Sequence, residues 1–257
     1  MSENRTPVLD VQGLGIDFGC LTAVNEFSLQ VFNEEIVGLI GPNGAGKTTV
    51  FNMLTKVYKP SRGTITFCGK NTEKMSVVEM NKQGIARTFQ NIRLFSNLTV
   101  LDNVRIGMHN KISYSNFDAV FRLPKFYEQE KKVEKEAVEL LKIFGLEDKK
   151  DIIAGNLPYG AQRRLEIARA MATEPKLLLL DEPAAGMNPQ ETEELMDMIR
   201  FVRDHFRIAV LLIEHDMKLV MGICERITVL NYGMMLAEGT PEEIQANPQV
   251  IKAYLGE

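Results

Sequence analysis

Hydrophobic residues recur along the first third of the chain with the spacing of strands. Residues 8–31 contain two alternating stretches, VLDVQGLGIDF and FSLQV, and GTITFCG at residues 63–69 is a third, so this part predicts a small β-rich layer. The run at Glu35–Ile40, EIVGLI, is compact and apolar, and a stretch with helical spacing follows from Lys47 to Val57. A strand, a turn and a helix in this order predict the start of an α/β core.

Helical spacing dominates the middle of the chain. Residues 103–155 are rich in charge, and the segment EQEKKVEKEAVELLKIFGL predicts an amphipathic helix. The apolar face of this helix comprises Val133, Ala137, Leu140, Leu141 and Phe144. This part of the chain therefore predicts a helical lobe that interrupts the core.

The α/β pattern returns after the lobe. The runs at Leu177–Leu180 and Ile208–Ile213 are apolar throughout, as strands are when both faces of a parallel sheet are covered. A helix predicted through Glu191–Phe206 separates them, which completes a βαβ unit. A helical tail is predicted at Thr240–Tyr254.

Composition fits this outline and narrows the function. The 257 residues are 45% hydrophobic and 25% charged, which is ordinary for one large globular domain with a smaller lobe. The formal net charge of −4 provides no broad cationic field for nucleic acid or anionic lipid. Nucleic acid is therefore the less favoured ligand.

The cysteines and the N-terminus indicate a reducing compartment. Cys20, Cys68 and Cys224 are odd in number and far apart, with no C-x-x-C pair, so we expect three buried thiols. The first residues lack the pattern of a signal peptide, and no apolar run approaches the roughly 20 residues of a membrane helix. If the protein works at a membrane, another protein has to hold it there.

The sequence GPNGAGKT at residues 41–48 matches G-x-x-x-x-G-K-[ST] between a predicted strand and a predicted helix. The glycines let the backbone wrap a phosphate chain, while Lys47 reaches the outer phosphates and Thr48 is placed to hold Mg²⁺. The alternative is a glycine turn with an exposed lysine, but all fixed positions are present in the right context. The residues predicted to bind nucleotide here are Gly41, Pro42, Asn43, Gly44, Ala45, Gly46, Lys47, Thr48 and Thr49.

An acidic pair follows the strand LLLL. Asp181 and Glu182 stand at its carboxyl end, where an α/β sheet binds its ligand. Alone, such a pair is more often a helix cap; after a phosphate-binding loop we interpret Asp181 as a magnesium ligand. Glu182 is then predicted to orient or deprotonate the water that attacks the γ-phosphate.

Two further polar residues are candidates for the same site. His215 ends the next apolar strand, in IEHD, where a donor can contact the γ-phosphate, whereas we interpret His109 and His205 as structural. Gln90, in RTFQN, can ligate Mg²⁺ and hold the attacking water through the two ends of its amide.

Five motifs in order carry a resemblance that covers nearly the whole chain. They are GPNGAGKT, RTFQN, LPYGAQRRLEIARA, LLLLDEP and LLIEHD. In this order the chain resembles the ATP-binding subunits of ABC transporters. RTFQNIRLF, LDEPAAGMNP, LLIEHDMKLVM and the tail GTPEEIQANPQVIKAYLG make it similar, within that family, to the subunits of bacterial branched-chain or hydrophobic amino acid importers.

The resemblance implies a fold and a division of the chain. The implied fold is α/β, a P-loop NTPase with a RecA-like core, an antiparallel β subdomain and an α-helical subdomain. Residues 1–257 would form a single ABC ATPase domain, with approximately 8–90 and 171–257 as the core with its β subdomain and 91–170 as the helical subdomain.

The resemblance also implies partners and an ATP and Mg²⁺ chemistry. A second ATPase subunit, identical or different, would form a head-to-tail dimer, with each ATP between the P-loop of one subunit and the signature loop of the other. Two transmembrane permease subunits would hold the protein at the cytoplasmic face of the inner membrane and dock on the segment after Gln90, and an external substrate-binding protein would act indirectly. Adenine would stack on Phe18, for which a place in the core is the alternative.

The signature loop departs from the family pattern Leu-Ser-Gly-Gly-Gln. The residues predicted to face the partner's ATP are Leu157, Pro158, Tyr159, Gly160, Ala161 and Gln162. Proline is tolerated in a first helical turn, so the helix dipole can still face a phosphate, but the serine hydroxyl is missing. Our hypothesis is a weakened site opposite a different ATPase subunit; the alternative is that Tyr159 and Gln162 make equivalent contacts.

Two other features leave alternatives open. Asn188 stands where the family has an aspartate, and it can hydrogen-bond across a dimer without contributing charge. Phe117, Phe121, Phe126 and Tyr127 are expected to pack on the helical lobe, the alternative being a docking surface for the membrane subunit.

Two other classes of function compete with transport. One is an ABC protein that acts on nucleic acid or ribosomes without a transporter; the acidic balance and the absence of long heptads oppose it. The other is a P-loop kinase, but the acidic pair, Gln90 and His215 favour water as the phosphate acceptor.

Overall fold

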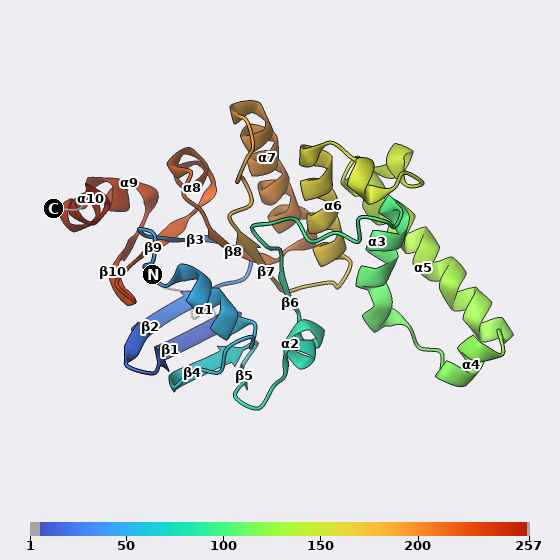
Figure 1. Cartoon of the computed structure of the whole chain (residues 1–257), viewed down its shortest axis with the longest axis horizontal. Coiled ribbons are helices and arrows are strands. Elements are labelled where there is room, and N and C mark those ends of the chain that lie inside the picture. Colours follow the sequence, from blue (N-terminus) through green and yellow to red (C-terminus); the bar gives the residue numbers. More distant parts are fainter. Residues whose placement is uncertain (1–5, 256–257) are drawn as a thin grey trace. The chain divides into compact units, whose positions relative to one another are not determined.

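The computed structural model describes residues 6–255, which divide into two compact units (Figure 1). One unit comprises the described residues up to Gln90 and from Lys176 onward, and the other comprises Asn91–Pro175. This helical unit extends a few residues beyond the approximate range of 91–170 expected from the sequence. None of the helices within residues 6–255 combines the length and the apolar character that a membrane span requires.

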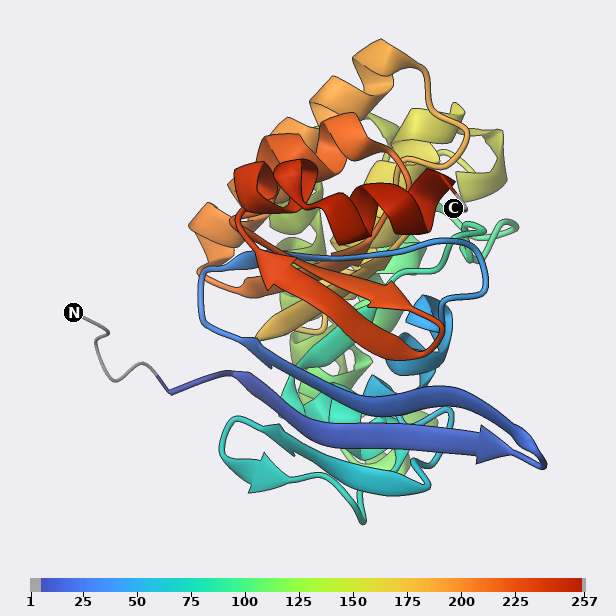
Figure 2. The same ribbon diagram turned by 90° about the vertical axis from the view of Figure 1, so that its left-hand side faces the viewer.

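The first unit contains the predicted β-rich layer as a four-stranded antiparallel sheet. Its strand order is β2-β1-β4-β5, and Figure 2 shows β1 and β2 as its longest members. The strands are β1 (Leu9–Phe18), β2 (Leu21–Val31), β4 (Arg62–Phe67) and β5 (Lys70–Asn71). Alternation along β1 buries one face of the sheet, which confirms the predicted strands.

The second sheet of this unit has six strands in the order β10-β9-β3-β8-β7-β6. The strands are β3 (Ile36–Ile40), β6 (Ile85–Arg87), β7 (Leu177–Asp181), β8 (Ala209–Ile213), β9 (Arg226–Asn231) and β10 (Met234–Gly239). Every residue of β3, β7 and β8 is buried, which explains their continuous apolar runs. All neighbours pair in parallel except β9 and β10, so the α/β prediction is confirmed.

Six α-helices accompany these sheets in the described part of the first unit. They are α1 (Lys47–Leu54), α2 (Val77–Gln83), α7 (Pro189–Phe206), α8 (Met217–Ile223), α9 (Pro241–Ala246) and α10 (Pro248–Leu255). The predicted helix from Lys47 ends at Leu54 rather than Val57, because Lys56 adopts a left-handed backbone conformation with φ of 61°. The predicted tail is two helices, because Pro248 starts a new helix after the extended cap Asn247.

The second unit is the predicted helical lobe. Its α-helices are α3 (Val100–Gly107), α4 (Asn116–Val120), α5 (Pro124–Ile143) and α6 (Tyr159–Met171), and short 3₁₀ turns lie at Met108–Lys111, Glu147–Lys149 and Ala154–Asn156. The predicted apolar face of α5 and the following Phe144 are buried. Helix α3 packs against both α5 and α6 (Figure 1), and a Cβ at Gly107 would lie 2.6 Å from the carbonyl oxygen of Arg169. Glycine thus allows α3 to approach α6 closely.

The expectation that the aromatic residues of this segment pack on the lobe is wrong for three of them. Phe117, Phe121 and Tyr127 are exposed rather than packed on the lobe. Phe117 and Phe121 belong to the short helix α4 and its C-cap, whereas Tyr127 lies in the first turn of α5. The rings of Phe117 and Phe121 contact each other, with centroids 4.4 Å apart, and Phe126 is half-buried against Tyr114.

Of the three cysteines only Cys224 is buried. Cys68 is half-buried, and Cys20 is exposed because it lies in the turn between β1 and β2. All three are free thiols, and burial raises the pKa of Cys224 to about 12, which keeps this thiol protonated and unreactive.

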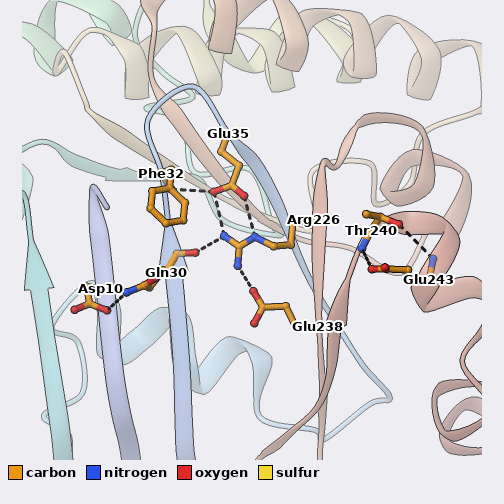
Figure 3. A network of polar contacts seen from close by, with 8 residues as sticks. All are labelled: Asp10, Gln30, Phe32, Glu35, Arg226, Glu238, Thr240 and Glu243. Atoms are coloured by element: carbon orange, nitrogen blue, oxygen red, sulfur yellow. Dashed lines mark hydrogen bonds and ion pairs between the residues drawn. The ribbon is translucent and has the colours of Figure 1, made fainter. Parts of the chain in front are cut away.

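A polar network joins the edges of the two sheets in the first unit (Figure 3). Arg226, at the start of β9, donates to both carboxylate oxygens of Glu35 at 2.9 and 3.1 Å. The same guanidinium contacts Glu238 on β10 and the Gln30 carbonyl on β2. Glu35 also accepts the backbone N–H of Phe32 at 2.9 Å. These contacts of the Arg226 guanidinium fix β9 beside β3, the strand that leads into the P-loop.

Candidate functional site

The P-loop is held by close backbone contacts that only glycine allows. A Cβ at Gly41 would lie 2.0 Å from the carbonyl oxygen of Leu230 on β9. Gly46 has a φ of 105°, and its Cβ would lie 2.8 Å from the carbonyl oxygen of Ala23. The Gly233 N–H also donates to the Ala45 carbonyl at 2.9 Å. The turn between β9 and β10 therefore holds the loop from outside.

The mouth of the loop suits a phosphate chain. Gly46 precedes α1 without a side chain that could cap the first N–H groups of the helix. Asn43, Gly44 and Thr48 are exposed, and a Cβ at Gly44 would point into open space. Backbone donors and a positive helix end thus face solvent at this point, which is the arrangement that binds phosphate.

Lys47 lies folded over the loop beside acidic groups. Its Nζ donates to the carbonyl oxygens of Gly41 at 2.7 Å and Pro42 at 3.0 Å, and the residue is only 6% exposed. Burial lowers the pKa of Lys47, and the nearby charges of Glu182 and Asp181 oppose that shift. The structure therefore brings the P-loop lysine and both strand-end carboxylates to one place, as their sequence positions predicted.

Gln90, Glu182 and His215 form a connected trio. The Gln90 side-chain amide donates to Oε2 of Glu182 at 2.6 Å, and His215 Nε2 lies 3.2 Å from Oε1. Glu182 has a φ of 46°, a left-handed backbone conformation that is uncommon for a non-glycine residue. The Glu182 N–H donates to the Ile213 carbonyl at 2.9 Å, so β8 supports this turn.

Asp181 has a partner that sequence reasoning missed. Its Oδ2 accepts a hydrogen bond from Arg87 at 2.6 Å, and both side chains are almost fully buried. Arg87 also donates to Asn52 at 2.7 Å and lies over the ring of Phe89. Arg87 ends β6, shortly before Gln90. Its position at a strand end is the sequence feature that could have identified it as a site residue.

The residues predicted as magnesium ligands are hard oxygen donors, which Mg²⁺ prefers. Thr48 is exposed at the loop mouth, and Asp181 shares its carboxylate with Arg87. Among the described residues no three His, Cys, Asp or Glu side chains form a group that could hold a metal ion. An ion here would therefore need phosphate and water oxygens as its other ligands, as is usual for Mg²⁺.

The signature loop lies in the second unit, where α6 begins at Tyr159 after Pro158. Pro158 is exposed and Gly160 half-buried, whereas Leu157 and Ala161 are buried. The Gln162 side chain donates to the Leu157 carbonyl at 2.8 Å, so it holds the loop instead of facing outward. This internal contact weighs against the alternative in which Gln162 replaces the missing contacts.

A fully buried ion pair supports the signature helix. Arg163 donates to Glu166 at 2.8 Å, and the two side chains are 0% and 1% exposed. Arg163 also reaches the Tyr159 hydroxyl at 3.4 Å, and Glu166 accepts the Arg93 backbone N–H at 3.0 Å. The pair therefore connects the signature loop to the segment that follows Gln90.

Two remaining candidates have local roles in this structure. Phe18 is 45% exposed and meets Tyr58 edge to face at 5.4 Å, so the alternative of a core phenylalanine is wrong. Asn188 caps α7: its side chain accepts the Glu191 N–H, and Glu191 reaches back to the Asn188 N–H. Adenine stacking on Phe18 and a contact of Asn188 across a dimer stay predictions.

A glycine loop closed around its lysine, beside strand-end carboxylates, defines a P-loop nucleotide-binding ATPase. The chain belongs to the ABC transporter family, whose model matches residues 24–185. A second model, described as branched-chain amino acid ATP-binding cassette transporter, matches residues 235–257.

Curated and solved relatives agree with this family. The chain is 51% identical to the high-affinity branched-chain amino acid transport ATP-binding protein LivG of Salmonella typhimurium, over 98% of each chain. It is 47% identical to the corresponding BraF protein of Pseudomonas aeruginosa over 98% of each chain. The ADP conformation of an ATP-binding cassette of an ABC transporter superposes with a TM-score of 0.85 at 30% identity, covering 98% of this chain and 100% of that one. The chain is thus an ABC ATPase.

Proposed function

We propose that this chain is the ATP-hydrolysing subunit of a membrane importer for branched-chain amino acids. The observation that carries the catalytic part is the trio of Gln90, Glu182 and His215 beside the P-loop lysine. The substrate class rests on the likeness to the LivG and BraF proteins over nearly the whole chain.

The side chains of the trio can divide the work of hydrolysis. Glu182 would orient the attacking water or take its proton, since Gln90 contacts one of its carboxylate oxygens and His215 the other. Lys47 and the first N–H groups of α1 would hold the phosphate chain. His215, 39% exposed in its side chain, would reach the γ-phosphate.

Magnesium completes this proposal. Thr48, Asp181 and the Gln90 amide oxygen would hold the ion together with phosphate oxygens. A bound Mg²⁺ supplies positive charge that offsets the charge developing on the phosphates. Arg87 would then fix the orientation of the Asp181 carboxylate, because it already grips one of its oxygens.

An exposed apolar patch supports docking on permease subunits. Phe95, Leu98, Ile152 and Ile153 in the second unit are all exposed. Their two segments are joined by backbone hydrogen bonds, among them Ala154 N–H to the Leu98 carbonyl at 2.8 Å. Side chains of this kind, held on a fixed backbone, suit a short amphipathic helix of a partner. The patch follows Gln90, as the predicted docking segment does.

ATP hydrolysis is tested on the purified chain with its co-purified membrane partners. Glu182→Gln is expected to bind ATP with wild-type affinity and to lose most of its turnover, because the amide cannot accept the water's proton. Lys47→Ala is expected to weaken nucleotide binding itself. Glu193→Gln, in an exposed ion pair with Lys218, is the matched control and should keep wild-type turnover. Wild-type turnover in Glu182→Gln would overturn the catalytic part.

The transported substrate needs a separate assay. Membrane vesicles that contain the assembled transporter and the external binding protein are supplied with ATP at the face that carries this subunit. We expect accumulation of labelled leucine, isoleucine or valine that stops in the Glu182→Gln assembly. ATP turnover without uptake of any of these amino acids would refute the substrate class and leave the ATPase intact.

A further inference from the structure

Glu214 is a buried carboxylate that sequence reasoning passed over. It follows β8 directly and is 3% exposed. Its Oε1 accepts the Ala184 N–H at 2.7 Å. Its Oε2 accepts the His215 N–H at 2.9 Å and the Asp216 N–H at 3.2 Å. One side chain thus satisfies three backbone donors from two different loops.

These two loops carry the catalytic candidates. Ala184 lies two residues after Glu182, in the turn where Glu182 adopts its left-handed conformation. His215 is the neighbour of Glu214 in the loop after β8. The carboxylate therefore bridges the backbone on both sides of the 3.2 Å contact between Glu182 and His215.

Burying a carboxylate at this bridge costs free energy, which argues against an accidental contact. Burial raises the pKa of Glu214, the N–H groups of Ala184, Asp216 and His215 oppose that shift, and the charge of Glu182 adds to it. A buried acid beside another acid costs free energy unless donors surround it. Here donors from both loops do so, and a side chain without two acceptor oxygens could not serve both.

We propose that Glu214 is a positioning residue that holds Glu182 and His215 in register for hydrolysis. The proposal rests on the catalytic roles given to these two residues above. Glu214 accepts hydrogen bonds from backbone N–H groups of both loops, so it acts on Glu182 and His215 through the loops. Its loss should therefore reduce the rate of the chemical step and leave ATP affinity unchanged.

The first test is Glu214→Gln in the full chain with its membrane partners. Glutamine has the same shape but only one acceptor oxygen, so its NH₂ group has to face either Ala184 or the pair of N–H groups at residues 215 and 216. We expect kcat to fall by roughly tenfold to a hundredfold, the scale of a small misplacement of catalytic groups. The Kd for a fluorescent ATP analogue should change less than twofold. Glu193→Gln is the matched exposed control.

A second variant guards against a folding defect. Glu214→Asp keeps the charge and can still accept the N–H groups of its own loop, but it is one methylene too short for Ala184. It should remain folded under the assay conditions, as circular dichroism measures, keep its ATP affinity within twofold of wild type and still lose kcat. A kcat within twofold of wild type in both variants overturns the proposal, and so does a parallel loss of ATP affinity and kcat. A Glu182→Gln variant with wild-type turnover would instead refute the function on which the proposal rests.

Discussion

Glu182 Oε1 lies 3.2 Å from Nε2 of His215, although the two residues follow different strands, β7 and β8, and are 33 positions apart. Parallel strands of one sheet present their carboxyl ends at the same edge, and β7 and β8 are direct neighbours with Asp181 opposite Ile213. The register of these two strands therefore decides the contact. A slip of one residue in either strand would turn the side chains of that strand to the opposite face of the sheet.

His215→Ala is expected to reduce kcat by roughly a hundredfold, because loss of one donor positioned at a developing charge has effects of this size. ATP affinity should stay near wild type, since Lys47 and the P-loop backbone are untouched. Steady-state hydrolysis and equilibrium nucleotide binding measure the two effects. His205→Ala is the control, because His205 is exposed on α7 and stacks on Phe201 away from the trio. Equal losses in the two histidine variants would count against a role for His215.

The buried pair of Arg163 and Glu166 makes a prediction about stability. Glu166→Ala removes the carboxylate partner of a guanidinium that is fully buried, which typically costs about 3 to 5 kcal/mol. Urea unfolding monitored by circular dichroism measures the loss. The double variant Arg163→Met and Glu166→Met removes both charges and should recover most of the free energy of unfolding. A double variant as unstable as Glu166→Ala would mean that the contact of Glu166 with the Arg93 N–H dominates instead.

The pKa of Glu214 predicts how stability varies with pH. Because burial raises this pKa above its usual value of 4.5, the folded protein holds the proton more tightly than the unfolded chain does. The stabilisation that this bound proton gives the folded protein is complete below pH 4.5. It is lost as the pH rises through the pKa of Glu214 in the folded state. The free energy of unfolding of wild type, relative to Glu214→Gln, should therefore fall as the pH is raised from about 4.5. Urea unfolding of both proteins across this range measures the difference. A difference that grows with pH would mean that the N–H donors outweigh burial.

Local patterns in the sequence were enough for the core strands and the P-loop. The runs of β3, β7 and β8 are continuous because both faces are covered, and the spacing of glycine, lysine and threonine specifies the loop. Strands β9 and β10 escaped prediction, although RITVLNYG combines an apolar run with a turn signal.

Long-range pairing could not be deduced from the same patterns. Arg87 and Asp181 are 94 positions apart, and nothing in the sequence around either residue indicates the other. Glu214 looked like an ordinary acidic residue beside His215, because only the fold brings Ala184 to it. The aromatic residues of α4 were misjudged for a related reason: their hydrophobicity predicts contact with something, and only the structure shows that this chain does not cover them.

Pro158→Ser tests whether the signature loop is weakened. A serine at this position would restore a hydroxyl at the start of α6, where Pro158 now contributes no side-chain cap. A hydrogen bond to a charged phosphate is typically about 1.5 to 3 kcal/mol, so turnover at the site that this loop faces should rise about tenfold or more. ATP hydrolysis by the assembled transporter measures this, with Ser at the exposed Pro248 as a matched control. Unchanged turnover in Pro158→Ser would favour equivalent contacts from Tyr159, whose hydroxyl lies 3.4 Å from Arg163. Tyr159→Phe would then reduce turnover, whereas in a weakened loop it would not.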